Sequence, residues 1–150
     1  MKLHHLKRSQ FVARPLNDVF AFFEQPENLV RITPPSMGFE ILTPPPIKMC
    51  AGALIDYTIR LLGFRTRWTT MITDYEPPRL FVDVQLKGPY TYWHHTHSFQ
   101  EEDGGTRLLD HVQYLMLLGY LGQVIHVLLV RKQLDRIIDY RARIIQSLFV

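Results

Sequence analysis

The chain has 150 residues, 47% of them hydrophobic, and a formal net charge of +3. This length suits one domain with a substantial core, and the charge excess is too small to predict nucleic-acid binding, which needs basic residues gathered on one face. The one cysteine, Cys50, excludes an intramolecular disulfide and a thiolate metal cluster, and fits a reducing compartment.

The first quarter of the chain predicts one strand followed by two short helices. Residues 2–13 are typical of a strand. Pro15 begins a helix, because proline is tolerated at the first helical position, where the missing N–H costs little. A second short helix is expected over residues 26–31, and Pro34-Pro35 ends it, since the residue before a proline avoids helical geometry.

Six strands joined by short turns are predicted next, because apolar and polar side chains alternate along each segment. Their ranges are 39–42, 53–62, 65–75, 80–86, 91–100 and 106–117. Gly119–Gly122 breaks the pattern, and residues 123–148 are typical of one long helix.

The order of elements predicts an α+β fold. A curved antiparallel sheet of about seven strands would wrap around the long C-terminal helix, because a single sheet must bury one face and this helix is the only element large enough to cover it. We expect residues 1–150 to form a single domain, with a ligand pocket between sheet and helix.

The segment from Gly88 to Phe99 carries the chemistry. Its strand would place Trp93, His95 and His97 on one face, because side chains alternate along an extended chain. The glycine-containing turn that follows is typical of a hairpin. If Glu101 pairs with Thr106, three further pairs follow: Phe99 with Leu108, His97 with Asp110 and Trp93 with Tyr114.

Asp83 and Gln85 share a face of the preceding strand. The turn between the two strands leaves the register open by one residue, and a slip of one residue reverses which side chains face the core. In one register Asp83 lies beside His95 and completes a polar chain of Asp83, His95, His97 and Asp110. In the other reading, Asp83 pairs with Arg65 or Arg67 of the neighbouring strand.

The sequence resembles the START-like superfamily, also called the polyketide cyclase/dehydrase or SRPBCC group, in a bacterial-type ligand-binding branch of unassigned function. The resemblance covers nearly the whole chain and is most specific from Phe81 to Tyr114. It implies a helix-grip fold and a hydrophobic cavity, but no single reaction, because this fold hosts binders, transporters and enzymes. The matching segments are Glu27-Asn28-Leu29, Thr33-Pro34-Pro35, Tyr57, Trp68, Phe81–Gln85, Gly88-Pro89-Tyr90, Trp93–Phe99 and Asp110–Tyr114.

The first hypothesis is a binding protein without a cofactor. Its ligand would be small and hydrophobic or amphipathic, such as a lipid, a polyketide-like molecule or an aromatic compound. Its polar end would meet His95, His97 and Asp110. The full set of candidate ligand-binding residues is Tyr57, Trp68, Asp83, Gln85, Trp93, His95, His97, Asp110 and Tyr114.

Other readings of the histidines stay open. They could be core groups that carboxylates satisfy, because buried carboxylates are rarely unpaired. In a cyclase or dehydratase, His95 or His97 would take a proton from carbon beside a carbonyl while Asp110 orients the ring. Binding is favoured over this enzyme hypothesis. Two histidines and Asp110 would also suit a zinc ion, but their spacing does not demand a metal, and none is assigned.

Residues 114–130 are almost wholly apolar and precede Arg131-Lys132. The segment is shorter than the ~20 residues of a spanning helix. It favours a strand end, a turn and the start of a buried helix, with a membrane-associated lipid-handling module as the alternative, because apolar residues beside basic ones suit anionic interfaces. The N-terminus lacks the apolar core of a secretory signal. We therefore expect a cytoplasmic protein, with peripheral membrane contact and the oligomeric state left open.

Overall fold

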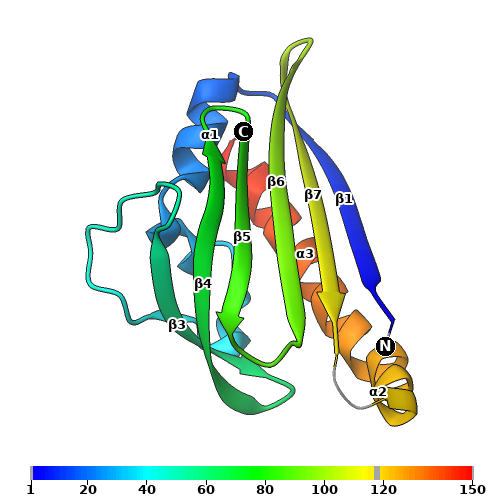
Figure 1. Cartoon of the computed structure of the whole chain (residues 1–150). Coiled ribbons are helices and arrows are strands. Elements are labelled where there is room, and N and C mark those ends of the chain that lie inside the picture. Colours follow the sequence, from blue (N-terminus) through cyan, green and yellow to red (C-terminus); the bar gives the residue numbers. More distant parts are fainter. Residues whose placement is uncertain (1, 117–118, 150) are drawn as a thin grey trace.

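The computed structural model describes residues 2–116 and 119–149 and contains one seven-stranded antiparallel sheet (Figure 1). Its strand order is β1-β7-β6-β5-β4-β3-β2. This confirms the predicted meander, with the first strand added beside the last. The strands are β1 (His4–Val12), β2 (Glu40–Ile41), β3 (Leu54–Leu61), β4 (Phe64–Glu76), β5 (Leu80–Lys87), β6 (Tyr92–Glu102) and β7 (Gly105–Leu115).

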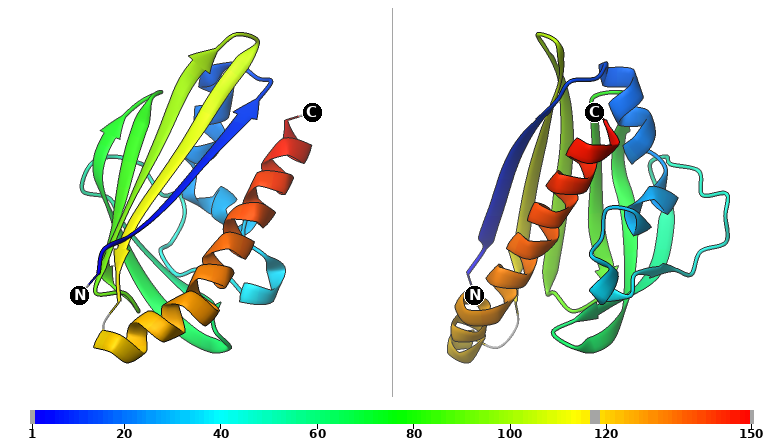
Figure 2. Two further views of the ribbon diagram at one scale, coloured as in Figure 1. Left: turned by 90° about the vertical axis from the view of Figure 1, so that its right-hand side faces the viewer. Right: turned by 180° about the vertical axis from the view of Figure 1, so that it is seen from behind.

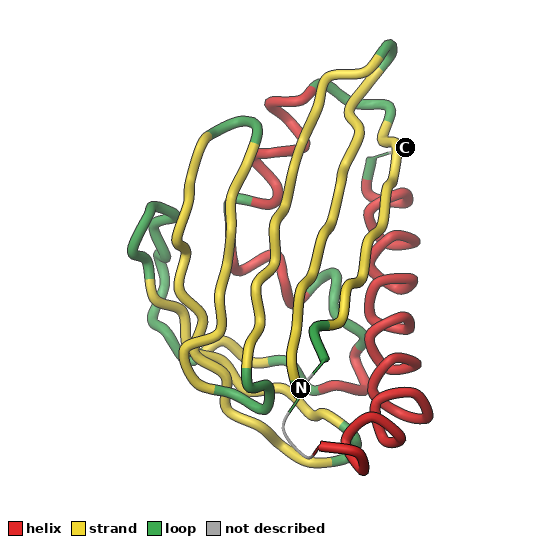
Figure 3. Tube along the Cα trace, turned by 45° about the vertical axis from the view of Figure 1, so that its right-hand side comes forward, coloured by secondary structure: helices red, strands yellow, loops and turns green. Residues whose placement is uncertain are grey.

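The helices lie on one face of this sheet (Figures 2 and 3). The two short helices predicted after the first strand are present as α1 (Leu16–Phe23) and the 3-10 turn η1 (Pro26–Val30), and a second 3-10 turn, η2 (Pro35–Met37), follows. The C-terminal helix α3 (Arg131–Leu148) runs diagonally across the concave face. The sheet therefore grips one long helix, as the order of elements predicted.

The start of the C-terminal helical segment differs from the prediction. Helix α2 (Gly119–Ile125) occupies the position of the expected break, and a π-helical stretch, η3 (His126–Val130), joins it to α3. A glycine destabilises a helix by about 1 kcal/mol relative to alanine. A helical segment that continues into a longer helix needs no nucleation of its own, so it forms in spite of this penalty. The predicted strand end at Leu117 lies outside the described residues. No helix in the described ranges is both long and apolar enough to cross a membrane.

The register of the central strands is as the hairpin turn predicted. Glu101 pairs with Thr106, and the three cross-strand pairs that follow from it are present: Phe99 with Leu108, His97 with Asp110 and Trp93 with Tyr114. Between β5 and β6, Asp83 pairs with His95. The alternative pairing of Asp83 with Arg65 or Arg67 is wrong, because these cations instead bind Glu40 at 2.9 Å and Asp56 at 3.3 Å.

Buried side chains fill the space between sheet and helices in two clusters. One surrounds Trp68 and Tyr114 and includes Leu134 and Ile138 of α3. The other surrounds Phe20 of α1 and includes Phe81, Phe99 and Ile145. Two register shifts in β4, at Thr69/Thr70 and Ile72/Asp74, accompany the curvature of the sheet, since bulges bend and twist a strand. The curvature gives the sheet a hollow that α3 closes.

Candidate ligand-binding site

A cavity of about 150 Å³ lies between the concave face of the sheet and α3. The helix contributes Leu134, Ile137 and Ile138 to its wall, and the segments after α1 contribute Leu29 and Ile32. Its lining is mostly apolar, with a few polar groups on the sheet. An engineered apolar cavity of about this volume binds benzene, so the space suits a compact molecule.

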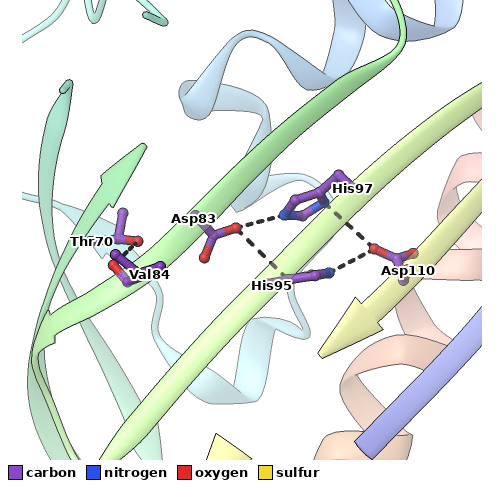
Figure 4. A network of polar contacts seen from close by, with 6 residues as sticks. All are labelled: Thr70, Asp83, Val84, His95, His97 and Asp110. Atoms are coloured by element: carbon purple, nitrogen blue, oxygen red, sulfur yellow. Dashed lines mark hydrogen bonds and ion pairs between the residues drawn. The ribbon is translucent and has the colours of Figure 1, made fainter. Parts of the chain in front are cut away.

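Four polar side chains form a closed group on the sheet side of this cavity (Figure 4). His95 Nε2 donates to Asp110 Oδ1 at 2.7 Å, and His97 Nε2 donates to Asp83 Oδ2 at 2.6 Å. The other ring nitrogens face the opposite carboxylates, with Nδ1 of His95 3.8 Å from Asp83 and Nδ1 of His97 3.5 Å from Asp110. Each imidazole therefore lies between two carboxylates, and we call these four residues the His–Asp group.

The hydrogen bonds of the His–Asp group run diagonally across the strands. Asp83 lies opposite His95 in the register but accepts its hydrogen bond from His97. Asp110 lies opposite His97 but accepts from His95. Diagonal neighbours on adjacent strands lie within reach of long side chains, so this arrangement needs no distortion of the ladder. The predicted chain of four residues is therefore present, with its partners exchanged.

Both carboxylates of the His–Asp group have lowered pKa values in spite of burial. Burial acts to raise the pKa of Asp110, but the hydrogen bond and the field of His95 outweigh it, so that this pKa lies below the ordinary 3.8. The hydrogen bond from His97 has the same effect on the pKa of Asp83. Burial, followed by the field of His95, lowers the pKa of His97 below 6.5. At neutral pH the group therefore holds two carboxylates and an uncharged His97.

Aromatic stacking fixes the two imidazole rings. Their centroids are 3.6 Å apart, and Phe81 stacks on the outer face of His97 at 4.2 Å. Trp93 meets His95 edge-on at 6.3 Å. Rings packed in this way keep one orientation, so the hydrogen bonds to the carboxylates are held in place.

The structure brings six of the nine predicted site residues to the cavity wall. They are Tyr57, Trp68, Asp83, Trp93, His95 and His97. Asp110 does not line the cavity and acts on it through His95. Tyr114 is fully buried behind the wall, where it packs against Tyr90 with the centroids 5.7 Å apart.

Gln85 also lies off the cavity wall, at the turn between β5 and β6. Its amide nitrogen donates to the carbonyl of Tyr90 at 2.7 Å, and its amide oxygen accepts from the backbone N–H of Tyr90 at 3.1 Å. The side chain is therefore committed to the turn rather than open to a ligand. Its effect is to fix Tyr90, which does line the cavity.

Arg141 on α3 is a charged cavity residue that was not among the predicted site residues. It lines the cavity opposite the sheet, and its field lowers the pKa of both Asp83 and Asp110. A signal was present in the sequence, because Arg141 follows Leu134 and Ile138 at the spacing of the buried helix face. A cation at an apolar position of a core-facing helix indicates a polar environment inside the fold.

One cluster in the described part of the chain could hold a metal ion: Asp83, His95 and His97, with one ligand atom from each within 4.8 Å of the others. The carboxylate differs from the predicted Asp110. Two histidines and one carboxylate match the ligand set of catalytic zinc. A metal would have to replace the hydrogen bond between His97 and Asp83, so the donors are already committed to one another.

The sheet, the gripping helix and the cavity between them define a helix-grip protein with a ligand-sized space. The family model described as polyketide cyclase / dehydrase and lipid transport matches residues 12–138. The chain belongs to this family. No curated protein matches the sequence.

Solved structures share this fold at low sequence identity. Protein TTHA0849 from Thermus thermophilus aligns with a TM-score of 0.76 at 16% identity, over 96% of this chain and 95% of that one. The Zhui aromatase/cyclase from Streptomyces sp. R1128 aligns with a TM-score of 0.73 at 16% identity, over 97% and 93%. Ginseng major latex-like protein 151 from Panax ginseng aligns with a TM-score of 0.72 at 10% identity, over 99% and 98%.

Proposed function

We propose that residues 1–150 form one ligand-binding domain that holds a compact hydrophobic or amphipathic molecule between the sheet and α3. The observation that carries this proposal is a mostly apolar cavity with the polar His–Asp group along one side. Sites for small molecules commonly combine apolar walls with a few placed polar groups. The volume of about 150 Å³ favours a one-ring or two-ring molecule over a long acyl chain.

Native mass spectrometry of protein purified from its producing cells tests this function. We expect an added mass that denaturation releases as a small apolar compound. Ile138→Trp would fill the cavity, because Ile138 lines it, and should abolish the added mass. Leu121→Trp, at a side chain that is 66% exposed, is the matched control and should retain it. Retention of the mass by a folded Ile138→Trp protein would place the ligand elsewhere.

Proton transfer is a second candidate function, favoured by the position of the histidines. His95 and His97 both line the cavity, and carboxylates hold both rings. The lowered pKa of His97 keeps its ring uncharged at neutral pH, so Nδ1, which lies 3.5 Å from Asp110, carries the lone pair that would accept a proton. This chemistry suits a cyclase or dehydratase that removes a proton beside a carbonyl group, as the name of one structural neighbour suggests.

Hydrogen–deuterium exchange of the methyl protons of acetophenone measures this step by NMR. An active base should accelerate the exchange above the rate in buffer, and His97→Gln should remove the acceleration. His5→Gln, at an exposed ring, is the control. Exchange at the buffer rate with the unaltered protein, in the presence of demonstrated acetophenone binding, would rule out the catalytic reading.

Peripheral membrane contact is a third candidate, favoured by a groove at the hairpin between β3 and β4. Exposed apolar side chains line it, with Leu128 57% and Leu129 51% exposed. Arg60, Lys132 and Arg136 also line it, and no carboxylate of a described residue does. Apolar groups bordered by cations suit an anionic bilayer. Ile137 lines both this groove and the ligand cavity, so a lipid surface would lie beside the binding site.

Flotation with vesicles of phosphatidylcholine and phosphatidylserine tests the membrane contact. We expect binding at low salt that weakens at high salt, and loss of binding in the double variant Lys132→Glu/Arg136→Glu. Arg79→Glu/Arg143→Glu changes the same charge at positions outside the groove and should float as the unaltered protein does. Equal flotation of both double variants would show that the groove is not the contact surface.

A further inference from the structure

Two buried N–H groups that border the cavity lack an acceptor among the described residues. One is Nε of Arg141 on α3, and the other is Nε1 of Trp68 on β4. Both residues line the cavity, one on the helix wall and one on the sheet wall. Most buried donors in folded proteins have a hydrogen-bond partner, so two unmatched donors beside one space indicate a ligand that supplies acceptors.

No acceptor of a described cavity residue forms a hydrogen bond with Nε of Arg141 or Nε1 of Trp68. Asp83 uses Oδ2 for the hydrogen bond from His97, and Arg141 makes no ion pair within the described ranges. Oδ1 of Asp83 receives no hydrogen bond from any residue that the structure describes. The cavity therefore offers donors on Arg141 and Trp68 and an acceptor on Asp83, each open to a third molecule.

We propose that Arg141 and Trp68 donate hydrogen bonds to a carbonyl oxygen of a neutral ligand, while Asp83 accepts one from a hydroxyl group of the same ligand. This inference rests on the proposed binding function and names the chemical class of its ligand: a compact hydroxyl-bearing ketone, ester or amide with an apolar ring. Arg141 and Trp68 are then specificity-determining residues.

The balance of charge favours a carbonyl over a carboxylate at this position. Two carboxylates, Asp83 and Asp110, oppose the one guanidinium of Arg141. A carboxylate on the ligand would add a third negative charge to a mostly apolar cavity, where like charges repel more strongly than in water. A carbonyl oxygen satisfies the donors without that cost.

Three single-ring probes of nearly equal size separate these possibilities. 3-Hydroxyacetophenone carries the hydroxyl and the neutral carbonyl, 3-ethylphenol lacks the carbonyl, and 3-hydroxybenzoate replaces the ketone by a carboxylate. The chain has two tryptophans, Trp68 and Trp93, and both line the cavity. Their indole N–H signals in a ¹⁵N-labelled sample therefore report occupancy by NMR titration.

We expect 3-hydroxyacetophenone to bind about tenfold tighter than 3-ethylphenol, the ratio expected for a hydrogen bond to a charged group, and 3-hydroxybenzoate to bind more weakly than the ketone. Arg141→Met should lower the affinity for the ketone most of the way to that for 3-ethylphenol, because only the hydrogen bond from Trp68 remains, and should leave the affinity for 3-ethylphenol unchanged. Arg143→Met, an exposed cation on the same helix, is the control and should keep the preference.

Each outcome decides one question. A ketone preference that is undiminished in Arg141→Met, or carboxylate binding as tight as that of the ketone, would overturn this inference. Equal affinity for all three probes would also overturn it while leaving the binding function intact. If none of the probes moves either indole signal of the folded protein, the binding of compact ligands fails and this inference fails with it.

Discussion

The ionisable groups on the two walls of the cavity differ in how they are paired. On the sheet wall, His95 and His97 are almost fully buried, and a carboxylate accepts a hydrogen bond from each ring. On the helix wall, Arg141 has a buried Nε without an acceptor among the described residues. The two walls thus place a matched polar group opposite an unmatched one.

This difference separates stability from recognition. Buried groups that are hydrogen-bonded stabilise the folded state, because removal of one partner leaves the other buried without a hydrogen bond. An unsatisfied buried donor costs the folded state free energy and is available to a ligand. The hydrogen bonds of the His–Asp group should therefore control the free energy of unfolding, and the unmatched donors of Arg141 and Trp68 should control which molecule binds.

Asp83→Ala should have the largest effect, because it removes the acceptor of His97 and leaves a buried N–H unpaired. We expect the free energy of unfolding to fall by about 2–3 kcal/mol. Urea denaturation followed by circular dichroism measures it. Glu40→Ala, which breaks an exposed ion pair with Arg65, is the control and should change it much less. Equal losses in the two variants would mean that the His–Asp group does not stabilise the fold.

Acidification should weaken the fold in two stages. The pKa of His97 is lower in the folded state than the ordinary 6.5, so the unfolded chain binds this proton first and stability is lost as the pH falls below that value. Asp83 and Asp110 have pKa values below the ordinary 3.8 in the folded state. Their contribution to the free energy of unfolding is therefore lost as the pH falls below 3.8 and through those lowered values.

Urea titrations measure these stages at three pH values: neutral pH, a pH between 3.8 and 6.5, and a pH below 3.8. An NMR titration assigns the first stage to the ring of His97. A free energy of unfolding that stays constant as the pH falls from neutral to well below 6.5 would contradict the lowered pKa of His97.

Arg141→Met should have the smallest effect on stability, about 1 kcal/mol or less in either direction, because removal of an unsatisfied buried donor offsets the loss of the field of Arg141 at Asp83 and Asp110. The same substitution should change ligand preference, as argued above. Thermal unfolding without ligand measures the first effect. A large loss of stability would show that Arg141 supports the fold, which would contradict its assignment as a residue of recognition alone.

The sequence predicted the parts of this site that follow from local geometry. A glycine-containing turn set the register of β6 and β7, and side-chain alternation then placed His97 opposite Asp110. It did not predict the bonded pairs, because register places Cα atoms opposite one another whereas long side chains reach diagonal neighbours. His97 therefore binds Asp83, and His95 binds Asp110.

The contribution of the helix wall could not be predicted in the same way. A strand pattern says which residues share a face of the sheet, but not where a helix distant in sequence crosses it. The periodicity of α3 could have marked Arg141 as facing inward. That this cation shares a cavity with Asp83 and Trp68 depends on how α3 lies across the sheet, which the spacing of its residues does not determine.

The turn between β5 and β6 has a consequence for the entropy of binding. The amide nitrogen and oxygen of Gln85 both hold the backbone of Tyr90, and a Cβ at Gly88 would come within 2.5 Å of Oε1 of Gln85. A rim tied down in this way loses little conformational freedom when a molecule arrives. The position of Tyr90 in the cavity wall is therefore set before a molecule arrives, so that fixing it costs a ligand little of its binding free energy.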